Sequence, residues 1–372
     1  MISGRCDFGI LSGEQIAYIS KSKDPAIAKS FFMIYRSKAP LRIGLAGGGT
    51  DVSPYSDLYG GAILNATVSL YAYANIEPLQ ENAIILQALD RKEEKRYEWM
   101  NELPVDGTLD LLKGVYNSIQ RDYGMPLTGF RLSTFVDAPA GSGLGTSSTL
   151  VVAIIGAFAE MFRLPLGEYD MAHLAYQIER HDLKMAGGRQ DQYAATFGGV
   201  NFMEFYGEDK VIVNPLRIKQ QYLFELENNL LLYYTSTSRE SAKIIEQQSS
   251  NVVNKQASPI DAMHQLKQQA QMMKEALLKG RLHEIGEILD FGFQQKRRMA
   301  EGISNSLMEE IYECAKKAGA TGGKISGAGG GGFMIFYCPD ITKYQVQDAL
   351  KRFGGYCQPY RFTEHGLTTW TI

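Results

Sequence analysis

A run of glycines and hydroxyl side chains at residues 137–148 has the composition of a phosphate-binding loop. The run reads DAPAGSGLGTSS and lies between an expected strand at 131–136 and an expected helix at 147–162. Its three alternate glycines let the backbone take positive φ angles and approach a ligand closely. The next helix adds unpaired amides at the positive end of its dipole. We therefore expect a phosphate cradle, with a tight turn that binds nothing as the alternative. The residues expected to bind phosphate are Gly141, Ser142, Gly143, Leu144, Gly145, Thr146, Ser147 and Ser148.

The spacing inside this loop separates it from two familiar nucleotide-binding motifs. It lacks the lysine of the G-x-x-x-x-G-K-[ST] loop, and its glycines do not fit the G-x-G-x-x-G pattern of dinucleotide-binding proteins. The hydroxyls of Thr146, Ser147 and Ser148 are hard oxygen donors, and one of them could reach a magnesium ion that bridges bound phosphates.

A second glycine run ends in a carboxylate. Gly47, Gly48 and Gly49 follow an expected strand at 41–46, and Thr50 and Asp51 come next. A carboxylate accepts hydrogen bonds from vicinal hydroxyls, so an aspartate in such a concave loop favours a sugar or polyol as ligand. The alternative is a hairpin or capping aspartate.

A third glycine run lies near the end of the chain, at residues 324–333, which read KISGAGGGGF. So many glycines cost backbone entropy on folding, which indicates close contact with a ligand or with another loop. A structural bulge before the expected strand at 333–337 is the alternative.

Two carboxylates complete the set of residues that could do chemistry. Glu179 lies on an expected helix at 169–184, and Asp191 follows it by twelve positions, after the Gly187-Gly188 turn. If they converge, one could bind a metal ion and the other could act as a base. The alternative reading makes Glu179 and Arg180 an exposed ion pair.

Composition limits the function further. The chain has 372 residues, 45% of them hydrophobic, and a net charge of -3, so it carries no basic surplus for nucleic acid. Its apolar runs fall short of the roughly 20 residues of a membrane span. The four cysteines form no C-x-x-C pair, which favours reduced thiols in the cytoplasm.

Hydrophobic periodicity predicts a strand-rich first part of the chain and a helix-rich later part. We expect a boundary within 207–221, so that domains at 36–210 and 211–372 follow an extension at 1–35, with Met33 as an alternative start. The remaining expected strands are 62–78, 84–89, 95–99, 200–206, 210–213 and 230–235. The remaining expected helices are 109–123, 191–198, 262–279, 282–301, 306–318 and 344–353.

The order of these loops between residues 36 and 337 resembles the GHMP kinases, the superfamily of galactokinase, homoserine kinase, mevalonate kinase and phosphomevalonate kinase. The resemblance implies an α+β fold with a ribosomal protein S5 domain 2-like N-terminal domain, a ferredoxin-like C-terminal domain and a site between them. The segments at 36–51 and 188–193 are most similar to the branch that phosphorylates D-glycero-D-manno-heptose 7-phosphate, whose relatives include L-fucose kinase.

The resemblance also implies cofactors and residue roles. ATP and Mg²⁺ are expected, with Ser147 and Glu179 as metal ligands and with Asp191 and Arg42 as catalytic residues. Thr146 replaces a serine of many members and keeps its hydroxyl, whereas Gly48-Gly49 replaces the Glu-His of galactokinases and argues against galactose. The expected substrate-binding residues are Gly49, Thr50, Asp51, Gly329 and Gly330.

The expected activity is transfer of phosphate from ATP to the anomeric hydroxyl of a sugar phosphate, by a monomer or homodimer. A sugar 1-kinase for an unphosphorylated sugar such as L-fucose is one alternative, and a catalytically silent nucleotide-binding regulator is the other. A phosphorylated acceptor requires cations, for which the candidates are Arg36, Lys38, Arg189 and Arg239.

Overall fold

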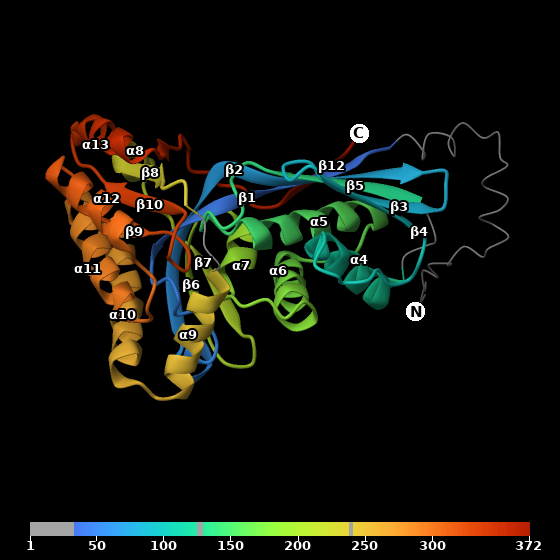
Figure 1. The fold of residues 1–372 in the computed structure, drawn as a ribbon, viewed down its shortest axis with the longest axis horizontal. Helices are drawn as coiled ribbons and strands as arrows, with labels where there is room; N and C mark the ends of the chain where they lie inside the picture. Colours follow the sequence, from blue (N-terminus) through green and yellow to red (C-terminus); the bar gives the residue numbers. More distant parts are fainter. Residues whose placement is uncertain (1–32, 125–128, 238–240) are drawn as a thin grey trace, which may run out of the picture.

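The computed structural model describes residues 33–124, 129–237 and 241–372. Two antiparallel-rich sheets, each covered by helices, lie at opposite ends of an elongated molecule (Figure 1). Most of the expected extension at 1–35 lies outside the described residues, and so does Arg239. The expected α+β class is confirmed.

The larger sheet is built on two long strands, β1 (Tyr35–Ala46) and β2 (Gly61–Leu79), which pair antiparallel. Its order is β12-β1-β2-β5-β3-β4, and β6 and β7 extend it from the first part of β2. The shorter strands are β3 (Ala83–Ala88), β4 (Glu93–Glu98), β5 (Gly129–Val136), β6 (Val200–Phe205), β7 (Val211–Pro215) and β12 (Thr368–Thr371).

Helix α5 (Thr146–Phe162) packs against β1 and β2 and is the centre of the first domain. It is apolar on nearly every side, as a helix must be when other helices cover its outer face. Its neighbours are α4 (Asp110–Tyr123), α6 (Glu168–Gln177) and α7 (Gln190–Phe197), on the same side of the sheet (Figure 1). This packing fixes where α5 begins, directly after the first glycine-rich loop.

The smaller sheet has the order β11-β8-β10-β9 and is antiparallel throughout. Its strands are β8 (Leu230–Tyr234), β9 (Gly322–Ile325), β10 (Phe333–Tyr337) and β11 (Tyr356–Cys357). The helices of this half are α8 (Gln220–Asn229), α9 (Ser241–Val253), α10 (Ala257–Lys279), α11 (Ile285–Arg297), α12 (Ser306–Lys317) and α13 (Thr342–Leu350). Helices α10 and α11 also contact β1, so the two halves share a packed interface.

The expected strands and helices around the first and third glycine-rich loops are confirmed within a few residues, whereas the strand expected at 41–46 is only the second half of β1. Helices α8 and α9 were not predicted, and neither were the short segments α3 (Tyr55–Tyr59), β9, β11 and β12. The two sheets also do not divide the chain at residue 210, where we expected the first domain to end. Strand β7 pairs with β6, and the chain end returns as β12 to pair with β1, so both belong to the larger sheet.

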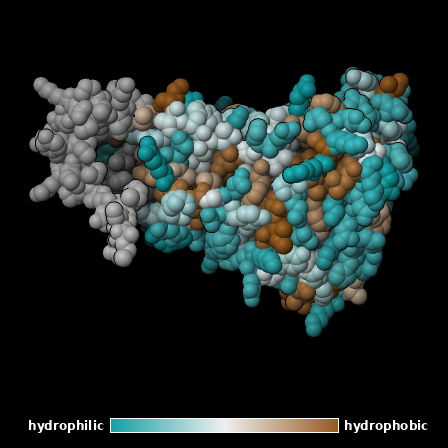
Figure 2. All heavy atoms as spheres, turned by 180° about the vertical axis from the view of Figure 1, so that it is seen from behind, coloured by the Kyte–Doolittle hydropathy of each residue, from teal (hydrophilic) through white to brown (hydrophobic). Residues whose placement is uncertain are grey.

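Seen from behind, hydrophilic side chains cover most of the helical end, and hydrophobic ones lie among them in small groups (Figure 2). Within the ranges that the structure covers, no helix has both the length and the apolar content of a membrane span.

Candidate active site

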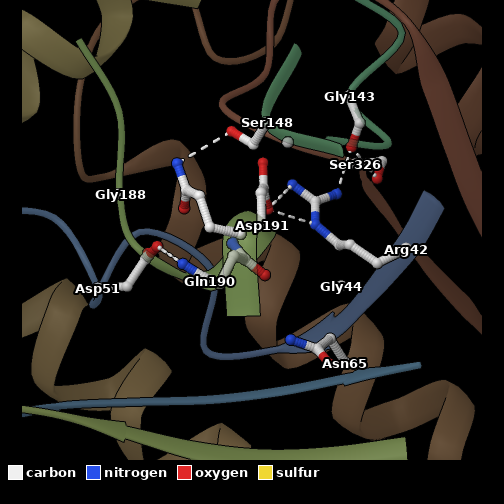
Figure 3. Close-up of polar contacts among 12 residues, drawn as sticks. Arg42, Gly44, Asp51, Asn65, Gly143, Ser148, Gly188, Gln190, Asp191 and Ser326 are labelled. Atoms are coloured by element: carbon white, nitrogen blue, oxygen red, sulfur yellow. Dashed lines mark hydrogen bonds and ion pairs between the residues drawn. The ribbon is translucent and has the colours of Figure 1, made fainter. Parts of the chain in front are cut away.

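The centre of the site is an ion pair between Arg42 on β1 and Asp191 in the first turn of α7. The Nε and Nη2 atoms of Arg42 lie 2.7 and 2.6 Å from Oδ1 of Asp191, and Nη1 donates to the carbonyl of Gly143 at 2.5 Å (Figure 3). The guanidinium therefore joins the carboxylate to the first glycine-rich loop, residues 137–148, which we call the phosphate loop because it is expected to bind phosphate. Arg42 is buried, whereas the Asp191 side chain keeps 21% of its exposure, so the carboxylate remains open to a ligand.

The phosphate loop has the backbone expected from its glycines. Gly141, Gly143 and Gly145 take φ angles of 71°, 83° and 80°, which other residues rarely adopt. Gly145 directly precedes the first residue of α5, so the unpaired amides of that helix face the same space. A Cβ on Gly145 would lie 3.1 Å from Cγ of Asp191, so the carboxylate packs directly on the loop.

The third glycine-rich loop packs on the phosphate loop. A Cβ on Gly143 would lie 2.6 Å from the carbonyl oxygen of Ser326, and one on Gly327 would lie 2.7 Å from Cα of Gly143. The Ser326 hydroxyl donates to the Gly143 carbonyl at 2.8 Å (Figure 3). The glycines at 324–333 thus serve contact with another loop, one of the two explanations that their number suggested.

Glu179 lies in a buried polar cluster behind the phosphate loop. It occupies a π-helical turn, Ile178–Asp182, which continues α6 and directs the carboxylate inward. Gln192 donates to Oε2 of Glu179 at 2.5 Å and to the Ser148 hydroxyl at 3.1 Å. Burial raises the pKa of Glu179, against the opposing effects of the Arg180 charge and of hydrogen bonds from Ser148 and Gln192. The alternative interpretation of Glu179 and Arg180 as an exposed ion pair is wrong, since Glu179 is 1% exposed.

Asp51 holds the loop that leads into α7. Its Oδ2 accepts hydrogen bonds from the amides of Arg189 and Gln190 at 2.9 and 3.1 Å (Figure 3). Burial raises the pKa of Asp51 although these backbone hydrogen bonds oppose the shift. Because both amides bind Oδ2, Oδ1 is the oxygen through which Asp51 can meet a ligand.

These groups line one open cavity of about 430 Å³, within the range of small-molecule sites. Its walls come from β1 and the Gly47–Asp51 loop, the phosphate loop, the π-helical turn, the 184–191 segment, α9, the end of α11 and the third glycine loop. Arg42, Gly49, Asp51, Glu179 and Asp191 all reach it. From the phosphate loop, Gly141, Gly143, Gly145, Thr146, Ser147 and Ser148 line it.

Several expected contact residues lie elsewhere. The Thr50 hydroxyl bonds to the carbonyls of Gly47 and Ala62, so it shapes the loop and does not line the cavity. Gly329 and Gly330 pack on Ile303 instead of the cavity, whose wall here is Gly327 and Ala328. The reason is that only the first part of this turn, at Gly327, contacts the phosphate loop, whereas Gly329 and Gly330 follow beyond that contact.

Two residues of the phosphate loop also face away from the cavity. Ser142 and Leu144 are fully buried, and they serve the loop through their carbonyl oxygens, which accept from the amides of Phe333 and Arg42. Their peptide groups thus fix the loop to both halves of the molecule.

Of the expected cations for an acceptor phosphate, the three that the structure describes, Arg36, Lys38 and Arg189, do not line the cavity. Arg189 is tied to Asp57 at 2.6 Å and to Asp209 at 3.3 Å. Arg36 and Lys38 lie at the start of β1 and do not line the cavity.

Sequence reasoning missed two lysines at the site, Lys296 of α11 and Lys324 of β9. They are 3% and 6% exposed. On α11 the buried positions 285, 288, 289, 292 and 293 recur at helical spacing, and Lys296 continues that stripe. That periodicity is the signal that could have identified Lys296, which otherwise reads as part of an exposed basic segment, QQKRR.

The oxygen donors near the phosphate loop are of the kind that a magnesium ion binds. Ser147 and Glu179 both line the cavity and both offer oxygen, which Mg²⁺ prefers. Within residues 33–124, 129–237 and 241–372 there is no cluster of three or more His, Cys, Asp or Glu side chains suited to a metal ion.

Comparison with known proteins agrees with this geometry. The family descriptions "GHMP kinases N terminal domain" and "GHMP kinases C terminal" match residues 110–199 and 273–355. D-glycero-alpha-D-manno-heptose 7-phosphate kinase of Campylobacter jejuni is 48% identical over 91% of this chain and 99% of its own length. A crystal structure of a D-glycero-D-manno-heptose 1-phosphate kinase from Bacteroides thetaiotaomicron is 46% identical, with a TM-score of 0.77 over 91% of this chain and 99% of that one. L-fucokinase/L-fucose-1-P guanylyltransferase of Bacteroides fragilis is 26% identical over 82% of this chain and 34% of its own length.

Proposed function

The chain belongs to the GHMP kinases, and from that premise we propose that it transfers the γ-phosphoryl group of ATP to the anomeric hydroxyl of D-glycero-D-manno-heptose 7-phosphate. The product is the 1,7-bisphosphate. The observation that carries this proposal is the contact of Asp191 with both Arg42 and the glycine loop at the N-terminus of α5. A kinase needs this combination, an acceptor-facing base beside a phosphate cradle.

In the proposed reaction the anomeric oxygen attacks the γ-phosphorus, the bond from that phosphorus to the β–γ bridging oxygen breaks, and ADP leaves. Asp191 takes the proton of the attacking hydroxyl. Arg42 holds Oδ1 of Asp191 with two nitrogens, so Oδ2 is the oxygen that receives the proton. The same guanidinium is fixed by the Gly143 carbonyl and stabilises negative charge on the migrating group.

Ser147 and Glu179 are the proposed ligands of Mg²⁺, which when bound neutralises charge on the β- and γ-phosphates. Ser148 and Gln192 orient the Glu179 carboxylate from behind. The amides of residues 141–148 bind the phosphates, and the glycines of this loop let the backbone approach them. Positioning of the two reactants supplies much of the rate increase.

The proposed acceptor follows from the relatives and from the cavity. The two most similar proteins described above carry heptose kinase names, although one name gives a 7-phosphate and the other a 1-phosphate. The Asp51 carboxylate offers Oδ1 to sugar hydroxyls, because Oδ2 is taken by the amides of Arg189 and Gln190. L-fucose is the second candidate, supported by the 26% identity to the fucokinase of Bacteroides fragilis.

The test is a panel of acceptors with ATP and Mg²⁺, followed by ³¹P NMR. We expect turnover of heptose 7-phosphate with a new phosphate resonance coupled to the anomeric proton. Reaction of L-fucose and not of heptose 7-phosphate would transfer the assignment to the second candidate. Tight ATP binding without turnover of any sugar would instead support a silent nucleotide-binding regulator.

A further inference from the structure

Lys296 and Lys324 are two buried cations that the proposed reaction does not use. Lys296 donates to the carbonyl of Gly327 at 2.5 Å and Lys324 to that of Gly44 at 2.5 Å. Among the residues that the structure describes, neither ammonium forms an ion pair with a carboxylate within 4 Å. An ammonium has three donors, and burial without a counter-ion is costly.

The two ammonium groups converge on the second glycine loop. A Cβ on Gly48 would lie 3.6 Å from Nζ of Lys296 and 3.9 Å from Nζ of Lys324. The absence of a side chain at this position therefore leaves space directly beside both charges. Burial lowers the pKa of Lys324 well below its ordinary value, and the nearby charges of Lys296 and Arg42 lower it further.

The other cations that line the cavity are in a different situation. Arg42 is paired with Asp191, and Arg180 lies 3.6 Å from Glu179. Lys184 lies at the exposed rim. Among the described residues, Lys296 is thus the buried cation of the cavity wall that has no ion-pair partner.

We propose that Lys296 and Lys324 form the subsite for the phosphate that the acceptor sugar already carries. This inference rests on the proposed function and deepens it, because it states what distinguishes a sugar phosphate from a free sugar at the same site. A phosphate dianion between two ammonium groups cancels their repulsion and fills their unused donors. Because position 48 is a glycine, no side chain fills the space between the two ammonium groups.

The location favours the acceptor over the nucleotide as the source of the phosphate. The carboxylate whose charge acts on Lys296 is Asp51, the proposed partner of the sugar hydroxyls. Gln248 of α9 reaches the same wall, 3.5 Å from a Cβ on Gly49, and its Nε2 has no hydrogen-bond partner in the described structure. Lys296 therefore borders the part of the cavity that the acceptor occupies, and Lys324 lies next to it, across Gly48.

The test compares Lys296→Met with the wild type on two acceptors, heptose 7-phosphate and unphosphorylated heptose. Removing one partner of a buried charge pair costs enough to predict a fall of about 10²-fold in kcat/KM with the phosphorylated sugar. With the free sugar we expect a change below about 3-fold, because the lost ammonium has no phosphate to bind there. Lys296→Arg should recover part of the loss. Lys279→Met, on an exposed surface of α10, is the matched control and should match the wild type.

An equal loss with both acceptors would overturn the inference, because it would assign Lys296 to the migrating phosphoryl group. Binding measured by calorimetry with a non-hydrolysable ATP analogue separates the two proposals. If the wild type binds heptose 7-phosphate and Lys296→Met does not, while neither turns it over, the subsite stands and the proposed activity fails. If both proteins bind the sugar phosphate equally, the subsite is refuted whatever the activity. Lys324→Met provides the second variant should Lys296→Met fail to fold, with the same expected discrimination.

Discussion

The cost of burying Lys296 predicts that its removal stabilises the protein without ligands. Burial lowers the pKa of Lys296 to about 8, from an ordinary value of 10.5, with the Arg42 charge adding to the shift and Asp51 opposing it. A difference of about 2.5 units corresponds to about 3 kcal/mol against folding. Lys296→Met forgoes the hydrogen bond to Gly327, which is worth about 1 kcal/mol. The net expected gain is about 2 kcal/mol at pH 7, or a rise of about 2 to 4 °C in Tm.

The sign of the pH dependence follows from the same values. Below pH 8 the lysine is charged in both states, so folding bears the whole cost. Between about pH 8 and 10.5 the unfolded chain binds the additional proton, so the cost diminishes as the pH rises. Calorimetric melts of wild type and Lys296→Met at pH 7 and pH 9.5 should show a stabilisation that shrinks at the higher pH. A variant that is less stable than the wild type at pH 7, or a shift equal at both pH values, would refute the reasoning.

Three further substitutions test separate parts of the site. Glu179→Gln should raise the Mg²⁺ concentration for half-maximal activity by at least about 10-fold, because a metal ligand is weakened; an unchanged requirement in a magnesium titration would remove Glu179 from the metal site. Asp51→Asn keeps an oxygen for the loop amides but weakens acceptance from sugar hydroxyls, so KM for the sugar should rise about 10-fold with little change in kcat; steady-state kinetics decide, and a fall in kcat alone would argue against it. In Gly143→Ala the new residue would have a φ of 83°, and its Cβ would lie 2.6 Å from the Ser326 carbonyl oxygen. Since the backbone strain alone costs about 1–2 kcal/mol, ATP binding should weaken by about 10-fold or more. Gly107→Ala is the control, because Gly107 has a φ of 92° but a Cβ there would meet no atom within 4 Å. Calorimetric titration of both variants with ATP therefore separates backbone strain from the clash with Ser326. Equal ATP affinities in the two variants would refute the role of this contact.

The sequence was most informative where local chemistry decides structure. Glycines at 141, 143 and 145 require positive φ angles that few other residues tolerate, so the loop and the start of α5 were predictable. Asp191 stood out as a carboxylate after a glycine turn, and the resemblance to the GHMP kinases gave it the catalytic role. Its contact with Arg42 joins residues 149 positions apart, and no local pattern indicates such a contact.

The features that escaped prediction depend on tertiary packing. Lys296 lies in a basic segment that reads as solvent-exposed, and only the burial of the whole α11 stripe turns it inward. The π-helical turn that buries Glu179 leaves no mark in hydrophobic periodicity, which assumes 3.6 residues per turn. Strand β12 is four residues long and pairs with β1, so its place depends on a partner more than 300 positions earlier.

Asp191→Asn is the most direct test of the account, because the substitution keeps the side-chain shape and removes the base. The amide oxygen of the asparagine can still accept the hydrogen bonds from Arg42, so the fold and the phosphate loop should persist. We expect kcat to fall by about 10²-fold or more, with the affinity for a non-hydrolysable ATP analogue within about 3-fold of the wild type. Near-normal turnover by Asp191→Asn would contradict the proposed transfer of a proton to this carboxylate, and with it the proposed mechanism.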